Sequence, residues 1–575
     1  MKHKIKISLI SIFFFAVLIN CGVFAKPVTK FQRGVAVSKN PDASQVGAYI
    51  LSKGGNAIDA AIATGYAIGA IEPSGSGLGG GGFALIYSAD KKELRAIDFR
   101  ERAPQNILKF KDKIDFKNGP TAAGIPGEVA GYEYLRQHYG RLSRKEILAP
   151  VIELAKVGSP VTKKLHSGIF DKKLLIEKYN ADKEIFLPGG RVPEVGETLK
   201  RPDLVKTLEL ISQKGADEFY KGNLARKIAS DTQKAGGIIT PDDLKNYKVY
   251  EVKPVCGTYR GNKICSFPPP SSGGVCILEA LNILENFDMP KYGHKDPERL
   301  HYLIEALKFS FKDRALKLGD PRFNKIPAEE LISKDYAKTI AEQIKLNSLP
   351  RHGFAPPRND NVSSTHTNTG NEKPETTHIT VVDNQGNIAA ITVSLNGSFG
   401  SCFEIPGTGI ILNDTLDDFA QNDAKPNQFG LVGNKFNAPE PGKTPLSSMS
   451  PTIVFDKDNN PILALGSPGG PTIISGVLNT LLAKLDQKMS LEDAVSAGRV
   501  HHQWNPDIVF SEKTLIDENT QKTLEEKYGY KFPEKGEHLW SKAYWYVQAV
   551  ELDPAKHILT GASDPRAEQG VSYQK

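Results

Sequence analysis

Cysteine is scarce in this chain, which has five in 575 residues, and none lies at zinc-ligand spacing from another. Charge of one sign is hardly in excess, with 73 Lys and Arg against 66 Asp and Glu and no dense basic stripe. Beyond the N-terminal segment, no apolar run reaches the roughly 20 residues that span a bilayer. Internal repeats are also lacking. These absences argue against a zinc-binding, a nucleic-acid-binding or a membrane-spanning mature protein.

The N-terminus has the pattern of a cleavable signal peptide. Three lysines precede a nearly wholly apolar stretch over 7–19, and residues 23–25 (VFA) supply the small residues of a cleavage site. We expect residues 1–25 to be removed and the mature chain to be exported, either to the periplasm or out of the cell. An uncleaved anchor is one alternative. A lipoprotein signal at Cys21 is another, which Asn20 disfavours.

The cysteines that remain after removal of the signal include one candidate pair. Residues 254–265 have the pattern of a β-hairpin that turns at Arg260-Gly261. Cys256 then lies opposite Cys265 at a non-hydrogen-bonded position, where a disulfide is within reach and an exported compartment permits it. Two reduced, buried thiols are an equal alternative.

Hydrophobic periodicity places strands and helices on both sides of a polar stretch. Residues 347–374 are rich in Pro, Asn, Thr and His and lack periodicity, as linkers do. Before this stretch we expect strands at 34–38, 83–87 and 94–99 and helices at 42–54, 59–71 and 300–318. After it we expect strands at 378–383, 388–395, 409–412, 452–455 and 462–465 and helices at 473–485 and 491–497. The mixture indicates one interlocked α/β body or two packed halves.

Two glycine-rich stretches are candidate elements of a site. Residues 73–82 (PSGSGLGGGG) follow a helix and precede a strand, the reverse of a dinucleotide fingerprint, and lack the Gly-Lys-Ser/Thr of a phosphate loop. We interpret them as a turn where backbones pass closely. Residues 466–470 (GSPGG) lie between a strand and a helix that begins near Thr472, where backbone N–H groups can stabilise an oxyanion. An ordinary glycine turn is the alternative.

Several polar residues at strand ends are ambiguous when each is considered alone. Arg100 follows a strand and can hold a substrate carboxylate, or else form an ion pair with a neighbouring acid. Ser447-Ser448 and Asp417-Asp418 are also residue types that turns favour. His501-His502 are adjacent and have no acidic partner at helical spacing, so we expect no metal site.

Thr376 is a candidate nucleophile because of its place at the end of the polar stretch. A hydroxyl needs an adjacent base, and the amine of a chain N-terminus is such a base, with an ordinary pKa near 8. If the hydroxyl of Thr376 cuts the Glu375–Thr376 bond, nucleophile and base are created together. The local alternative is that Thr376 and Thr377 simply begin a strand.

Taken together and in order, these motifs resemble those of the γ-glutamyltranspeptidases. The resemblance runs from about Gly34 to the C-terminus. It includes residues 73–82, 98–101, 124–131, 268–274, 375–383, 395–396, 409–419, 445–452, 466–470 and 561–566. It implies the four-layer αββα sandwich of the N-terminal-nucleophile hydrolases. It also implies that one precursor cuts itself into a large subunit, 26–375, and a small catalytic subunit, 376–575.

The resemblance also assigns roles by position. Thr376 becomes the nucleophile and new N-terminus, and Ser394, where the family usually has a second threonine, hydrogen-bonds to it. Arg100, Ser447 and Ser448 would bind the α-carboxylate of the substrate. Asn396 and Asp418 would bind its α-amine, and Thr415 lies at another substrate-binding position. Gly469 and Gly470 would form the oxyanion hole. No metal or cofactor is implied. Two residues depart from the pattern, since Thr415 replaces Gln or Glu and Phe429 replaces Tyr in a covering loop.

The implied reaction transfers a γ-glutamyl group from glutathione or a related compound to Thr376, and then to water, an amino acid or a dipeptide. A β-lactam side-chain acylase of the same architecture, which accepts a glutaryl group without an α-amine, is the first alternative. Asp418 disfavours it because a carboxylate suits an ammonium ligand. An unprocessed exported binding protein is the second.

Overall fold

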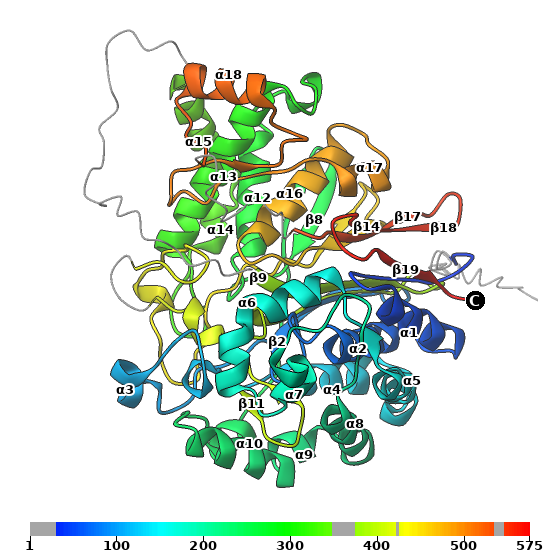
Figure 1. The fold of residues 1–575 in the computed structure, drawn as a ribbon. Coiled ribbons are helices and arrows are strands. Elements are labelled where there is room, and N and C mark those ends of the chain that lie inside the picture. The colour runs from blue at the N-terminus through cyan, green and yellow to red at the C-terminus, as the bar shows by residue number, and fades with distance from the viewer. Residues whose placement is uncertain (1–29, 348–373, 421–424, 534–544) are drawn as a thin grey trace, which may run out of the picture.

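The computed structural model describes residues 30–347, 374–420, 425–533 and 545–575. The predicted signal peptide and nearly all of the polar stretch lie outside these residues. Two antiparallel sheets form the centre of the molecule, and helices cover the outer face of each sheet (Figure 1).

The first sheet has seven strands in the order β19-β1-β9-β10-β2-β3-β6. Their bounds are Gly570–Tyr573 for β19, Val35–Ser38 for β1, Pro374–Val382 for β9, Ile388–Gly397 for β10, Gly81–Ser88 for β2, Glu93–Phe99 for β3 and Tyr250–Val252 for β6. The central strands are buried along nearly their whole length, which matches their near-continuous apolar sequences.

The second sheet has six strands in the order β18-β17-β14-β13-β8-β7. Their bounds are Ile558–Ser563 for β18, Gln548–Asp553 for β17, Pro461–Gly466 for β14, Thr452–Phe455 for β13, Asn262–Ser266 for β8 and Val255–Tyr259 for β7. Both sheets combine strands from before and after Thr376. The two portions of the chain therefore form one interlocked body.

Three hydrophobic layers separate four layers of secondary structure. One layer lies between the two sheets, where the rings of Phe83 and Phe267 stack 4.2 Å apart. A second lies between the first sheet and helices that include α1 (Pro41–Ser52), α2 (Ala57–Ile71), α4 (Glu128–Tyr139), α5 (Arg144–Val157) and α8 (Pro202–Lys214). A third lies between the second sheet and α12 (Gly273–Leu284), α13 (Pro297–Lys317), α15 (Lys334–Asn347) and α16 (Thr472–Leu485). This is the predicted αββα sandwich.

The predicted elements are confirmed within a few residues, with one informative exception. The sequence predicts a loop-like stretch up to Thr376 and a strand from 378, but β9 begins at Pro374 and Glu375 pairs with Asn396 on β10. The prediction of a loop end was wrong because Pro and Glu disfavour strands, whereas here the neighbouring strand supplies the partner for their backbone. The Glu375–Thr376 bond therefore lies inside the sheet.

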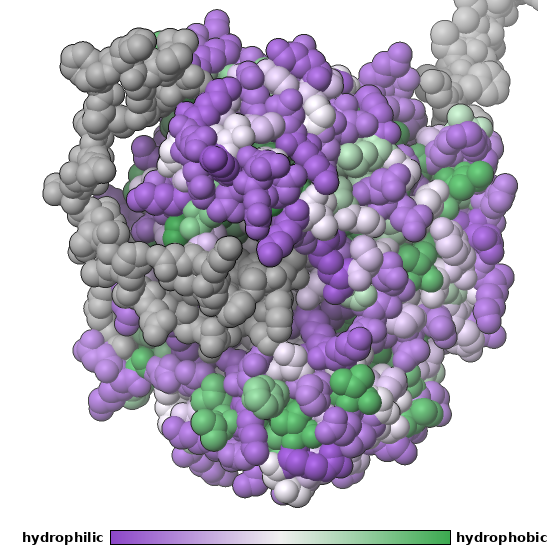
Figure 2. All heavy atoms as spheres, turned by 45° about the horizontal axis from the view of Figure 1, so that its top comes forward, coloured by the Kyte–Doolittle hydropathy of each residue, from purple (hydrophilic) through white to green (hydrophobic). Residues whose placement is uncertain are grey.

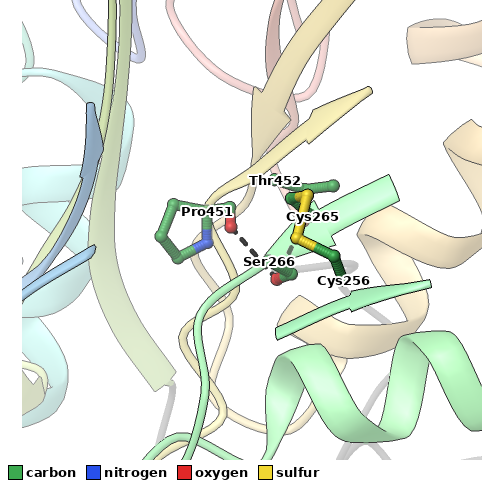
Figure 3. Close-up of a disulfide and its surroundings, with 5 residues drawn as sticks. All are labelled: Cys256, Cys265, Ser266, Pro451 and Thr452. Carbon is green, nitrogen blue, oxygen red and sulfur yellow. Dashed lines mark hydrogen bonds between the residues drawn. A yellow bond between two sulfur atoms is a disulfide. The ribbon is translucent and has the colours of Figure 1, made fainter. Parts of the chain in front are cut away.

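The structure joins Cys256 and Cys265 by a disulfide across the hairpin of β7 and β8, which turns at the predicted Arg260-Gly261 (Figure 3). Their Cα atoms are 4.1 Å apart, as expected for a non-hydrogen-bonded pair. Ser266, next to Cys265, donates a hydrogen bond to Pro451 O on the adjacent segment. The disulfide thus clamps one edge of the second sheet, while Cys276 and Cys402 are buried and take no part in it.

We expect denatured, unreduced protein to be alkylated at Cys276 and Cys402 but not at Cys256 or Cys265. Peptide mass mapping measures this directly, with reduced protein as the control. Because the disulfide closes a short loop, replacing both of its cysteines by serine is expected to lower the free energy of unfolding by about 2–3 kcal/mol. Alkylation of Cys256 without reductant would contradict the pairing.

The molecular face drawn in Figure 2 is mostly hydrophilic, and its hydrophobic residues form small, separate groups. Within the described ranges, every helix is too short or too polar to cross a lipid bilayer.

Candidate active site

A cavity lies where the two sheets meet the loops that follow β3, β10 and β14. It brings together most of the predicted site residues, which are far apart in sequence. The predicted residues that line it are Arg100, Thr376, Ser394, Asn396, Asp418, Ser447, Ser448 and Gly470.

Thr376 lies on β9 with its side chain at the cavity and nearly no exposed surface. Its Oγ1 is 2.6 Å from Glu375 O, to which it donates a hydrogen bond, and 3.1 Å from Ser394 Oγ. Ser394 Oγ in turn lies 2.9 Å from the same carbonyl oxygen. Two hydroxyls thus converge on the carbonyl of the bond that joins Glu375 to Thr376.

An irregularity in β10 places Ser394 in this position. The register of β10 against β9 shifts between Val393 and Asn396, and Asn396 has a left-handed backbone with φ 82°. Such bulges redirect side chains and are common beside active sites. The N–H of Asn396 donates to Ser394 Oγ at 2.8 Å, which fixes the hydroxyl.

The glycine run 73–82 packs against this bulge, which confirms that backbones pass closely there. A Cβ atom on Gly80 would lie 2.3 Å from Ser394 O, and one on Gly79 would lie 2.0 Å from Ile411 O. Any larger residue at either position would displace β10 or the strand Ile410–Ile411 (β12).

Gly469 and Gly470 form the turn between β14 and α16, and both have positive φ, 127° and 56°. Gly470 lines the cavity. Among the described residues, neither amide N–H of this pair donates a hydrogen bond. Unpaired N–H groups at a helix N-terminus are favourable donors to a negatively charged oxygen.

Arg100 and Asp418 form a buried ion pair in the cavity wall. Arg100 follows β3, and its Nη2 lies 2.5 Å from Asp418 Oδ2, while Asn427 Nδ2 donates to Asp418 Oδ1 at 3.0 Å. Burial raises the pKa of Asp418 above its usual value, and the positive charges of Arg100 and Arg314 oppose that shift. One cation and one anion are thus side by side at the cavity surface.

Ser447 and Ser448 reach the cavity on a segment held by residues 268–274. The N–H of Ser447 donates to Pro270 O at 2.9 Å, and Ser272 Oγ donates to Ser447 O at 2.6 Å. Residues 268–274 (PPPSSGG), one of the motifs that carry the family resemblance, therefore hold the backbone of Ser447 in place.

Thr415 and Phe429 are the two departures from the family pattern. Thr415 is fully buried, outside the cavity lining, at the start of the 3₁₀ turn that ends at Asp418. Its N–H donates to Asn413 Oδ1, whose Nδ2 also bonds Gly79 O, so this position ties the turn to the glycine run. Phe429 does line the cavity, where its ring contributes apolar wall.

The cavity also contains residues that the sequence did not indicate. Arg314, on α13, lines it and donates from Nε to Ser272 Oγ at 3.0 Å. Nothing in the helical periodicity of 300–318 distinguishes this arginine from a solvated one, since only the packing of α13 against the 268–274 segment turns it inward. The other unforeseen lining residues are apolar: Leu431, Leu446, Met449, Pro471 and Ile473.

Within the residues described, no cluster of three or more His, Cys, Asp or Glu side chains is placed to hold a metal ion. His501 and His502 are both buried, and His501 hydrogen-bonds Ser475 and Gln503. Burial lowers the pKa of both imidazoles, that of His501 to about 3.

The four-layer sandwich is the architecture of the N-terminal-nucleophile hydrolases. Thr376 and Ser394 lie on neighbouring central strands of its first sheet. A cephalosporin acylase from Bacillus halodurans superposes with a TM-score of 0.80 over 97% of this chain and 99% of that one, at 27% identity. A γ-glutamyltranspeptidase from Helicobacter pylori matches with a TM-score of 0.54 over 58% of this chain and 95% of that one, at 37% identity.

The sequence comparisons then identify the family. The γ-glutamyltranspeptidase family model matches residues 43–574. A glutathione hydrolase proenzyme of Escherichia coli K12 is 41% identical over 93% of this chain and 91% of its own length. The chain belongs to the γ-glutamyltranspeptidase family, and it is an enzyme of that family.

Proposed function

We propose that this chain is a self-processing glutathione hydrolase and γ-glutamyltransferase with Thr376 as its nucleophile. The observation that carries the proposal is the convergence of Thr376 Oγ1 and Ser394 Oγ on Glu375 O, inside the cavity that also contains Arg100 and Asp418. Family membership supports the activity. The relatives named as proenzymes support cleavage of a precursor.

The proposed maturation begins with attack of Thr376 Oγ1 on the carbonyl carbon of Glu375. The hydrogen bond from Ser394 Oγ polarises that carbonyl, which favours attack. The C–N bond breaks as the Thr376 nitrogen takes up a proton, and an ester joins Glu375 to Thr376. Water then hydrolyses the ester, which leaves Glu375 as the C-terminus of a large subunit, 26–375, and Thr376 as the N-terminus of a small one, 376–575.

In the mature enzyme, the α-amine of Thr376 would act as the base for its own hydroxyl. The hydroxyl attacks the γ-amide carbonyl of glutathione, the N–H groups of Gly469 and Gly470 stabilise the oxyanion, and the leaving amine receives the proton. A γ-glutamyl ester remains on Thr376. Water releases glutamate from it, or an amino acid or dipeptide accepts the γ-glutamyl group.

The paired charges of Arg100 and Asp418 support a substrate that carries both an α-carboxylate and an α-amine. These two groups share one carbon atom in a γ-glutamyl compound, so their charges lie close together, as the guanidinium and carboxylate do here. Ser447 and Ser448 add hydroxyl donors for the carboxylate, and Asn396 adds an amide for the amine.

The test is to purify the exported protein, sequence its N-termini and assay a γ-glutamyl anilide. The proposal predicts two chains, one starting at or near Lys26 and one starting at Thr376, together with release of the aniline. An intact chain without a Thr376 terminus would instead support an exported binding protein.

The structural match to a cephalosporin acylase favours a second candidate, a glutaryl-type acylase. Such a substrate lacks the α-amine, so it makes no use of the carboxylate of Asp418 beyond the ion pair that this residue already forms with Arg100. Turnover of a glutaryl anilide that exceeds turnover of the γ-glutamyl anilide would favour the acylase.

Ser394→Ala is expected to slow self-cleavage by about 10²-fold, because one donor to the carbonyl of Glu375 is lost. It is also expected to slow γ-glutamyl turnover, because the hydroxyl that contacts Thr376 Oγ1 is lost. Gel analysis over time measures the first rate, and anilide assays of the cleaved fraction measure the second. Ser394→Thr keeps the hydroxyl and is the matched control, with near-normal rates. Unchanged rates in Ser394→Ala would remove this residue from the proposed mechanism.

A further inference from the structure

Two lysines hold the side chain of Glu375 beside the scissile bond. Lys39 follows β1, and Lys164 lies in the first turn of α6 (Lys163–Tyr179). Lys164 Nζ is 2.9 Å from Glu375 Oε2, and Lys39 Nζ is 3.8 Å from the same oxygen. The side chains of Lys39 and Glu375 are each 3% exposed. Within the described part of the chain, Lys39 Nζ makes no hydrogen bond.

The charges of this cluster balance only while Glu375 is present. Glu72 is buried behind the lysines and accepts a hydrogen bond from Asn40 Nδ2 at 3.3 Å. Burial lowers the pKa of Lys39, and the carboxylates of Glu375 and Glu72 oppose that shift. If Glu375 leaves, two buried ammonium groups face one carboxylate, an arrangement that favours uptake of another carboxylate.

The cluster lies directly beside the reacting strand. A Cβ atom on Gly75 would lie 2.5 Å from Lys39 Nζ, 3.3 Å from Thr377 Oγ1 and 3.5 Å from Thr376 O. Lys164 Nζ also lies 4.2 Å from the centre of the Tyr546 ring, which limits where its ammonium group can move.

The proposed reaction brings the leaving group of the substrate to this side of Thr376. The base is the Thr376 nitrogen, so the leaving nitrogen must come within hydrogen-bonding distance of it. Glu375 occupies that space before cleavage. A chain of covalent bonds joins the Thr376 nitrogen to the carboxylate carbon of the Glu375 side chain. In glutathione, a chain with the same number of bonds joins the leaving nitrogen to the C-terminal carboxylate carbon. The leaving nitrogen lies one hydrogen bond farther out than the Thr376 nitrogen, so the flexible leaving peptide must fold back to bring its carboxylate to the two lysines.

We propose that Lys39 and Lys164 form a carboxylate subsite that Glu375 fills in the precursor and that the C-terminal carboxylate of a γ-glutamyl peptide fills in the mature enzyme. The subsite serves the peptide that leaves and the peptide that accepts. This inference rests on the proposed nucleophile, Thr376. It gives the enzyme a preference for γ-glutamyl peptides with a free C-terminus over uncharged γ-glutamyl amides.

The deciding experiment uses the wild-type, processed enzyme and needs no variant. It compares kcat/KM for glutathione with that for glutathione amidated at its C-terminal glycine. Loss of one charge-assisted contact is expected to lower kcat/KM for the amide by about 10- to 100-fold, mainly through KM. Equal values for the two substrates would overturn the subsite.

Variants then locate the contact. Lys39→Gln and Lys164→Gln are each expected to reduce the ratio of kcat/KM for glutathione to kcat/KM for its amide by about 10-fold or more. Lys163→Gln, which removes the adjacent exposed lysine, is the matched control and should leave the ratio unchanged. A wild-type ratio that persists in both subsite variants would also refute the assignment. If a subsite variant does not mature, the wild-type comparison alone decides.

A γ-glutamyl anilide separates this inference from the proposed function, since it carries no C-terminal carboxylate. Anilide turnover with equal kcat/KM for glutathione and its amide would refute the subsite and leave the function intact. Absence of anilide turnover in a cleaved enzyme would refute the function itself, and the subsite with it.

Discussion

Thr376→Ala is expected to give a single uncut chain whose turnover of a γ-glutamyl anilide is lower by at least about 10⁴-fold. The variant lacks the hydroxyl that is proposed to attack Glu375, so the bond inside β9 should stay intact and no free α-amine should form at this position. Nucleophile and base are thus lost through one substitution. Intact-mass analysis measures the first effect, and steady-state kinetics measures the second.

Thr377→Ser is the matched control for that variant. Thr377 is the next residue on β9, is fully buried, and accepts a hydrogen bond from Ser76 Oγ at 3.2 Å. Serine keeps this contact, so the control should cut itself and turn over substrate. Full activity in an uncut Thr376→Ala chain would show that another residue is the nucleophile.

Much of the candidate site could be predicted from the sequence because its residues occur in short motifs at the ends of predicted strands. Arg100 follows β3 and the GSPGG turn follows β14, so finding those strands placed them at the rim of the sheets. The ambiguity of each motif taken alone was real. The order of all the motifs along the chain removed this ambiguity, because that order is a property of the family rather than of any one segment.

What could not be predicted depends on contacts between distant segments. Arg314 and Lys39 each lie in a local pattern that equally suits a solvated side chain. Arg314 reaches the cavity because α13 packs over the 268–274 segment, and Lys39 reaches Glu375 because β1 pairs with β9. The extension of β9 back to Pro374 has the same cause, since the bulged end of β10 supplies its partner.

Maturation inside a sheet has a structural consequence for the two proposed subunits. β9 and β10 lie between β1 and β2, and β13 pairs with β8, so each sheet contains hydrogen-bonded ladders between the two portions. Cutting one peptide bond leaves all these ladders and the three hydrophobic layers in place. The cleaved chains are therefore expected to remain associated without a covalent link.

Asp418→Asn is expected to lower kcat/KM for a γ-glutamyl anilide by about 10²- to 10³-fold. The substitution keeps the shape of the side chain but removes the negative charge that we propose faces the substrate α-amine. It also leaves Arg100 without its partner at 2.5 Å. Recognition of a group with both charges requires both members of the pair, so the loss should appear mainly in KM.

A glutaryl anilide is the internal control, because it has the same γ-carbonyl chemistry and no α-amine. Its kcat/KM is expected to fall much less than that of the γ-glutamyl anilide in Asp418→Asn, since no ammonium contact is lost with this substrate. The ratio of kcat/KM for the γ-glutamyl anilide to kcat/KM for the glutaryl anilide should therefore fall nearly as much as kcat/KM for the γ-glutamyl anilide itself. Equal losses for both substrates would mean that Asp418 supports the fold of the cavity through Asn427 and Arg100, and that the α-amine is bound elsewhere.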